Sequence, residues 1–109
     1  DSVAEATVLR RIAGFGLPRP VTQHDVVDRD GSFVARVDLA WPDRRVAREY
    51  DSDGYHPPSK AEADELRRRR IEAAGWSVDV IHRGHLLPSR EDWLRSLRAD
   101  LRAAHRRAS

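Results

Sequence analysis

Asp38, Glu49 and Asp51 are the residues whose types and spacing best suit chemistry. They lie on either side of residues 42–45, a Pro-Asp-Arg-Arg segment that predicts a tight turn between two short antiparallel strands. With the turn there, Asp38 lies directly opposite Glu49, and Asp51 falls on the same face of the hairpin. Like charges directly opposite each other destabilise a strand pair, so the cluster needs a compensating interaction.

A carboxylate pair of this kind is tolerated under three conditions. One carboxyl takes up a proton, an arginine neutralises the pair, or a hard divalent cation lies between the two groups. Arg36, opposite Asp51 on the same face, is a candidate for the arginine. The cation is the more informative condition, because Mg²⁺ favours one or two carboxylates with water and phosphate oxygens, and it activates water for hydrolysis. Spacing alone gives equal weight to solvated carboxylates on an exposed sheet face.

Glu5 is a further candidate from a distant part of the chain. It shares a helical stripe with Val8, Leu9 and Ile12, the side expected to pack on the sheet, and a carboxylate aimed at a core needs a partner. The pattern Ser2-x-x-Glu5 also has the form of a capping box. The residues alone therefore favour a helix cap, with a site role as the alternative.

The elements that must position these side chains follow from hydrophobic periodicity and turn residues. Strict alternation predicts a strand over residues 33–41, with every second residue from Phe33 to Trp41 on one buried face. Gly75 is expected to stop a helix, and Trp76 to anchor the strand after it. A strand reached by a helical crossover lies parallel to an earlier strand, so the order predicts an α/β fold with a mixed sheet flanked by helices. Helices are predicted over residues 2–13, 59–74 and about 89–106, and strands over 21–27, 33–41, 46–51 and 76–82.

Composition sets the class of protein. The chain has 109 residues, which predicts one domain with its own core. It has no cysteine, which excludes disulfides and thiolate metal sites, and no apolar run long enough to span a membrane. Of its 20 basic residues only Lys60 is not arginine, which favours nucleic-acid phosphate as a partner or reflects a GC-rich genome. The absence of methionine predicts that residues 1–109 are the C-terminal module of a longer protein.

Four stretches together resemble a known family: SVAEATVLRRIAGFGLPRPVTQ, RVDLAWP, AREYD and DELRRRRIEAAGWSVDVI. In this order, from about residue 2 to residue 87, they are similar to small actinobacterial domains related to very-short-patch-repair endonucleases, a branch of the PD-(D/E)XK nuclease superfamily. The resemblance implies a restriction-endonuclease-like αβββαβ core, which is the element order expected above, followed here by a C-terminal helix. It also implies a Mg²⁺-dependent endodeoxyribonuclease in which Mn²⁺ substitutes for Mg²⁺.

The resemblance assigns roles residue by residue. Asp38 matches the aspartate of the family motif and Glu49 the acidic residue after it. These two residues, with the backbone carbonyl of Tyr50, are the implied metal ligands. Glu5 matches the glutamate of the first helix that helps to complete the metal site, which raises the weight of its site role. Asp51 occupies the position where many members of the superfamily have lysine, and aspartate is usual there in this branch.

The histidines and the loop after Asp51 carry the remaining implications. His56 is the implied general base or phosphate-binding group. Ser52 stands where the branch has glycine, so the loop departs from the family pattern although the carboxylates do not. This departure supports the alternative function, a nuclease fold that has lost catalysis and serves as a nucleic-acid-binding or assembly module. His82 and His85 have no companion ligand set, so a zinc site is not predicted.

Arg36, Arg67, Arg70 and Gln23 are the predicted nucleic-acid contacts. The four arginines of residues 67–70 surround their helix, so at most two face one surface, and ion pairs with nearby acidic residues are expected for most of the run. The resemblance implies DNA as the partner and an N-terminal DNA-binding or regulatory domain in the full-length protein. A homodimer is left open, no membrane partner is expected, and the expected location is cytoplasmic.

Overall fold

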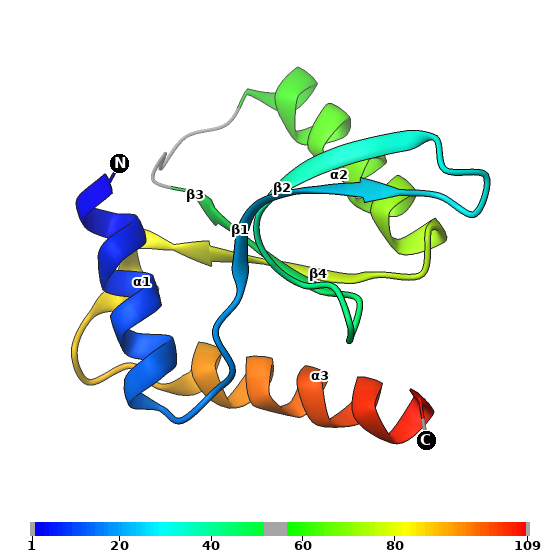
Figure 1. Cartoon of the computed structure of the whole chain (residues 1–109). Coiled ribbons are helices and arrows are strands. Elements are labelled where there is room, and N and C mark those ends of the chain that lie inside the picture. The colour runs from blue at the N-terminus through cyan, green and yellow to red at the C-terminus, as the bar shows by residue number, and fades with distance from the viewer. Residues whose placement is uncertain (1, 52–56, 109) are drawn as a thin grey trace.

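The structure is a computed structural model that describes residues 2–51 and 57–108, with side chains described for residues 3–51 and 57–104. It confirms the predicted order of elements, a helix, three strands, a helix, a strand and a final helix (Figure 1). The elements are α1 (Ser2–Gly14), β1 (Val21–Val27), β2 (Phe33–Trp41), β3 (Val46–Asp51), α2 (Pro58–Ala73), β4 (Ser77–His82), a 3₁₀ helix (Arg83–Leu86) and α3 (Asp92–Ala108).

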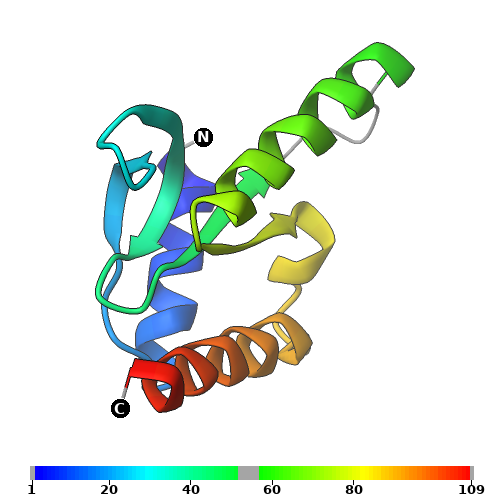
Figure 2. The ribbon, with the colours of Figure 1, turned by 90° about the vertical axis from the view of Figure 1, so that its right-hand side faces the viewer.

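The four strands form one mixed sheet in the order β1-β2-β3-β4. β2 runs antiparallel to both β1 and β3, and β4 runs parallel to β3 after the α2 crossover, as the crossover rule predicts. Figure 2 shows α3 on one side of the sheet and α2 on the other. The chain is therefore an α/β protein with three layers.

The turn between β2 and β3 is the one that the sequence predicts. Residues 42–45 form it, closed by backbone hydrogen bonds of 2.9 and 3.2 Å. The strand pairs are 39–48, 40–47 and 41–46, which is the predicted register. Asp38 and Glu49 are the next residues along the two strands, so the turn carries both carboxylates to the same end of the hairpin.

Two apolar clusters hold the helices on the sheet. The first joins the sheet to α1 and α3 and buries the apolar stripe of α3, which includes Trp93, Leu94, Leu97 and Leu101. The second lies under α2, where Ile71 and Trp76 pack against β1, β2 and β3. Trp76 is thus the packing anchor that was predicted. Gly75, with φ of 95°, ends α2 in the left-handed conformation that glycine adopts most readily.

The predicted alternation of β2 is wrong in its first half. Leu39 and Trp41 belong to the cluster on the α3 side, but Ala35 and Val37 belong to the cluster under α2, and Phe33 is 65% exposed. The reason lies in β1. Gln23 has a left-handed backbone with φ of 51°, and the β1–β2 ladder has no pair between 22–39 and 24–37. One residue out of the pleat changes which face the following side chains occupy, so the hairpin curls over α2.

α2 projects from the sheet at its N-terminal end. Every side chain from Pro58 to Leu66 is exposed, and Figure 2 shows this half of the helix extending away from the other layers. The helix therefore depends on Ile71 for burial and on side-chain pairs along its surface. Two of these pairs, Arg68–Glu65 at 3.8 Å and Arg69–Glu65 at 3.4 Å, confirm the ion pairing expected within residues 67–70. Lys60–Asp64 at 3.5 Å is a further pair on the same helix.

The start of α3 differs from the prediction of about residue 89. The helix begins at Asp92, after a 3₁₀ helix that the sequence analysis did not predict. The guanidinium of Arg90 pairs with the carboxylate of Asp92 at 2.7 Å, and Arg11 of α1 donates hydrogen bonds to the carbonyls of Leu87 and Arg90. These contacts fix the segment before α3 in a non-helical path. Among the described residues, no helix has the length and apolar character needed to cross a membrane.

Candidate functional site

Asp38 lies where the hydrogen-bond ladder between β2 and β3 ends. The last backbone pair is 39–48, and beyond it the carboxylate of Asp38 replaces a backbone acceptor. Its Oδ2 accepts a hydrogen bond of 2.8 Å from the backbone N–H of Tyr50. A half-buried carboxylate is thereby fixed between the two strands, next to Glu49.

Gln23 brings a second group to Asp38. Its Nε2 donates to Asp38 Oδ1 at 3.4 Å, from the left-handed residue that interrupts β1. A non-glycine residue in this conformation costs about 1 kcal/mol or more, and such strain is concentrated at functional sites. Gln23 is one of the predicted nucleic-acid contacts. The structure places it beside the carboxylate cluster.

Arg67 connects the cluster to α2. Its Nη1 donates to Glu49 Oε1 at 2.5 Å, and its Nη2 donates to the backbone carbonyl of Arg36 at 2.6 Å. One guanidinium therefore links β2 and β3 beyond the end of their ladder. The hydrogen bond to Glu49 raises the pKa of Arg67, and the charge of Asp38 adds to this effect. Both carboxylates thus act on the same guanidinium.

The arginine that neutralises the cluster is therefore Arg67 and not the predicted Arg36. Arg36 is exposed and pairs with Asp25 on β1, with 2.8 Å between Nε and Oδ1. The hydrogen bond from Arg36 lowers the pKa of Asp25. The prediction failed because the partner across β2–β3 was considered and the partner across β1–β2 was not. Arg36 contributes its backbone carbonyl to the site, through Arg67.

A cavity of about 500 Å³ adjoins the cluster, between α2 and the strands β3 and β4. Val78 and Val80 contribute apolar surface to it. Glu49 and Asp51 line it from β3. Charged residues of both signs line it from α2, namely Lys60, Arg67 and Arg68 together with Asp64 and Glu65. The cavity is therefore polar, with carboxylates on the β3 wall and mixed charge on the α2 wall.

His82 is a candidate that the sequence analysis considered only as a zinc ligand. It lines the same cavity, and the parallel β3–β4 register pairs it with Asp51. Its backbone N–H donates to His85 Nδ1 at 2.8 Å, and the two rings stack with centroids 5.6 Å apart. The sequence could have indicated this position of His82, because the residue ends the strand that was expected to lie parallel to an earlier strand.

Two predicted site residues, Glu5 and Arg70, are not among the residues that line the cavity beside the cluster. Glu5 is exposed, which contradicts the expectation that it faces the core with Val8 and Ile12. The cause is position along the helix, since Val3 in the same first turn is also exposed, at 71%. Arg70 lines a separate hollow on the other side of α2, beside Phe33 of β2.

Two other predictions fall outside the described part of the chain. His56 and Ser52 belong to residues 52–56, which the structure does not describe. The Ser2 side chain of the expected capping box also lies outside it. Asp51 is described, and its backbone lies at the end of β3 beside His82 of β4.

A divalent cation fits the chemistry of the donors at this site, although Arg67 already contacts one of them. Asp38 and Glu49 supply hard oxygen ligands beside the backbone of Tyr50, which is the kind of donor set that Mg²⁺ favours. Within residues 3–51 and 57–104, no three histidine, aspartate or glutamate side chains are grouped closely enough to hold a metal. Among the described side chains, Asp38 and Glu49 are therefore the two that would hold such an ion, with other ligands from the backbone, water or phosphate.

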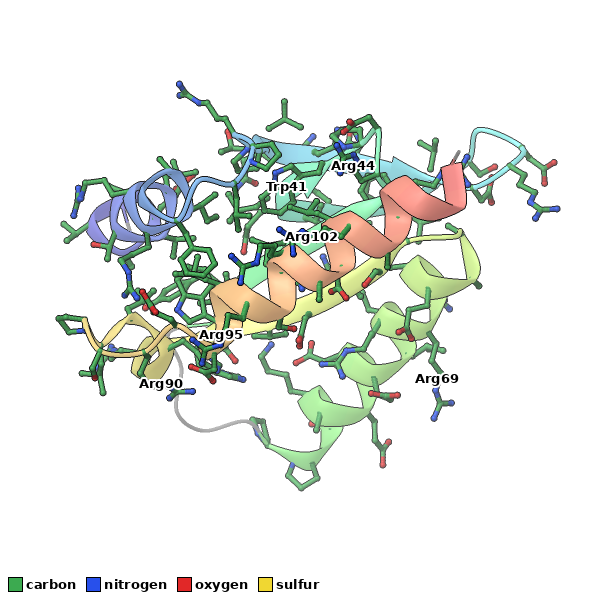
Figure 3. The ribbon with its side chains drawn as sticks, turned by 90° about the horizontal axis from the view of Figure 1, so that it is seen from below. Trp41, Arg44, Arg69, Arg90, Arg95 and Arg102 are labelled. Carbon is green, nitrogen blue, oxygen red and sulfur yellow. The ribbon has the colours of Figure 1, made fainter. Side chains whose placement is uncertain are left out.

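The arginines of the sequence lie on several elements of the domain. Figure 3 shows Arg44, Arg95 and Arg102 on the side of α3, and Arg69 on α2 pointing away from the sheet. Arg44 donates to the carbonyl of Leu101 at 3.0 Å, so part of the arginine bias serves packing between a turn and α3. Position at the cavity, and not charge alone, singles out Arg67.

Comparisons with known proteins give relatives without an activity. No protein-family model matches the chain, and no solved structure matches it. Two proteins of Mycobacterium tuberculosis are similar to it, the uncharacterized protein MT2308 of strain CDC 1551 / Oshkosh and the uncharacterized protein Rv2248 of strain ATCC 25618 / H37Rv. Each is 33% identical over 79 residues, which is 72% of this chain but 29% of the relative. The chain thus spans less than a third of the length of these curated relatives.

Proposed function

We propose that the chain is a metal-dependent DNA endonuclease domain with a restriction-endonuclease-like fold. The observation that carries the proposal is that Asp38 and Glu49 face each other just beyond the end of the β2–β3 ladder, with Arg67 bonded to Glu49 and a cavity beside it. Two carboxylates on neighbouring strands, in an α/β chain with the element order of this nuclease superfamily, are an arrangement that can hold Mg²⁺ for phosphodiester hydrolysis.

The residues divide the work as follows. Asp38 and Glu49, with the backbone carbonyl of Tyr50, hold the cation, which when bound polarises the scissile phosphodiester and activates water. The N–H of Tyr50 and the amide of Gln23 orient Asp38. Glu5 and His56 keep the roles that the resemblance implies, as an accessory ligand and a general base, and these two roles rest on that resemblance alone.

The cavity beside Glu49 is the proposed place for the DNA strand. Lys60 reaches it from the exposed half of α2, where its ion pair with Asp64 spans 3.5 Å. An exposed pair of this kind is worth about 0–1 kcal/mol, so a phosphate group displaces the carboxylate easily. His82 and Asp51 line the cavity beside the proposed strand, where a histidine supplies a hydrogen bond or a proton.

Nicking of supercoiled plasmid tests the proposal. With Mg²⁺ or Mn²⁺ the protein should convert supercoiled to open-circular plasmid, and Asp38→Asn and Glu49→Gln should each slow this by about a hundredfold or more. Asn keeps an oxygen that accepts from the N–H of Tyr50, so loss of the fold is not the expected cause. Asp43→Asn, in the turn at the other end of the hairpin, is the matched control and should cleave normally.

The same contacts also favour a second function, one that does not involve a cation. Arg67 on Glu49 and the N–H of Tyr50 on Asp38 satisfy both carboxylates without any cation. That is the pattern expected of a nuclease fold that has lost catalysis and serves as a nucleic-acid-binding or assembly module. DNA binding that survives Asp38→Asn and Glu49→Gln, with no nicking by the unchanged protein in any divalent cation, would select this function over the first.

A further inference from the structure

Arg67 occupies a position beside the Glu49 carboxylate that a bound divalent cation would also occupy. Its Nη1 contacts Glu49 Oε1, and its pKa is raised by that contact and by the charge of Asp38. The pair is not exposed in the manner of the other ion pairs on α2, since the Glu49 side chain is only 21% exposed. A guanidinium and a divalent cation repel each other, so both cannot bind one half-buried carboxylate without loss.

The second contact of Arg67 indicates what its release would change. Nη2 donates to the backbone carbonyl of Arg36, so the same guanidinium stabilises the separated ends of β2 and β3. The side chain also lines the cavity, on the wall that carries Lys60 and Arg68. Once free of Glu49, a planar fork of donors at that wall is suited to a phosphate oxygen pair.

We propose that Arg67 is a built-in competitor of the cation: its ion pair with Glu49 and metal binding at Asp38 and Glu49 exclude each other. This inference rests on the proposed function. The free protein is held in the arginine-paired state, and a DNA phosphate that draws Arg67 into the cavity opens Glu49 for the metal. Because coupling between two ligands is reciprocal, DNA and metal then strengthen each other's binding.

Mn²⁺ affinity, measured by calorimetry and by the electron paramagnetic resonance signal of free Mn²⁺, tests this without any turnover. Arg67→Gln should bind Mn²⁺ about tenfold more tightly than the unchanged protein in the absence of DNA. Arg68→Gln is the matched control, because it removes the same charge from the adjacent residue. Arg68 lines the same cavity, and among the ion pairs of the described residues it takes part only in the one with Glu65. Its Mn²⁺ affinity should change by less than about twofold.

The outcomes separate the competition from the proposed activity. Equal Mn²⁺ affinity in Arg67→Gln and Arg68→Gln, with an unchanged protein that binds Mn²⁺ and nicks plasmid, would overturn the competition and leave the nuclease in place. Weaker Mn²⁺ binding in Arg67→Gln would also overturn it and would make Arg67 a support of the site. No Mn²⁺ binding by any of the three proteins, together with no nicking, would reject both. Should Arg67→Gln not fold, as judged by circular dichroism, Arg67→Met removes the charge, keeps a long side chain and should also bind Mn²⁺ more tightly than the unchanged protein.

Discussion

At the scale of single residues, the charged side chains of this domain differ widely in solvent exposure. Most ion pairs on α2 are exposed and weak, but Arg48 on β3 is 2% exposed. Its Nη2 donates to Asp100 Oδ2 of α3 at 2.6 Å, and its Nη1 donates to the carbonyl of Ala47 at 2.9 Å. A buried cation with one carboxylate partner makes the stability of the domain sensitive to that partner.

Asp100→Ala should therefore lower the free energy of unfolding by about 3 kcal/mol, because it leaves the cation of Arg48 buried and unpaired. Urea unfolding followed by circular dichroism measures the change. Asp64→Ala, which removes an exposed carboxylate 3.5 Å from Lys60, is the control and should cost about 1 kcal/mol or less. A loss below about 1 kcal/mol in Asp100→Ala would mean that water reaches Arg48 in solution.

The contact partners of long side chains were the feature that the sequence predicted least well. The type and strand of Asp38 and Glu49 followed from a turn and a register, both of which are local properties. Arg67 was assigned to phosphate, yet it contacts Glu49, which lies 18 positions away in sequence. That contact depends on how α2 crosses the sheet, which no periodicity encodes. A flexible guanidinium has too many positions within reach for its sequence neighbours to select one.

At the scale of elements, the start of α3 carries a clear electrostatic signature. The hydrogen bond from Arg90 lowers the pKa of Asp92 from its ordinary value of 3.8 to about 2, and Asp92 lies in the first turn of the helix. The folded state therefore favours the carboxylate form. Its contribution to stability is present above the ordinary pKa and is lost as the pH falls from about 4 towards about 2.

Titration of the Asp92 carboxyl carbon by nuclear magnetic resonance should show a pKa of about 2. In Arg90→Gln the pKa should move up towards 3.8, because the largest cause of the shift is removed. Arg95→Gln is the control, since Arg95 pairs with Glu91 and not with Asp92. An unchanged pKa in Arg90→Gln would assign the shift to the helix N-terminus instead of to the side chain.

Local sequence patterns predicted the bounds of the strands better than they predicted the face of the sheet on which each side chain lies. The bounds of β1, β2 and β3 match the predictions because turn residues flank each strand. The face of Ala35 and Val37 was wrong, since a left-handed glutamine has no compositional signature and one such residue reverses the alternation. Glu5 was misplaced because helical periodicity defines a side of a helix but not how far the neighbouring layer extends along it.

At the scale of the whole molecule, two cores share one sheet. The cluster on the α3 side is large, and the cluster under α2 depends on few residues, among them Ile71 with no exposed surface. The strands contribute to both clusters, so the loss of either weakens the same sheet. We therefore expect the domain to unfold as one unit in spite of the projecting helix.

Ile71→Ala should lower the free energy of unfolding by about 3 kcal/mol, because it opens a cavity where α2 meets the sheet. Unfolding curves from circular dichroism and tryptophan fluorescence should still coincide. Leu66→Ala, at a position of the same helix that is 49% exposed, is the control and should cost less than about 1 kcal/mol. Separate transitions for the two probes would show that α2 melts apart from the sheet.

The left-handed Gln23 has an effect on how these molecules meet one another. β1 is the outermost strand on its side, and a border strand with regularly spaced amides invites strands from other chains to join it. Gln23 breaks that regular spacing near the middle of the strand. The edge of β1 therefore offers no continuous row of backbone groups to a strand of another molecule. Gln23, which holds Asp38 in place, thereby also disfavours self-assembly into fibres.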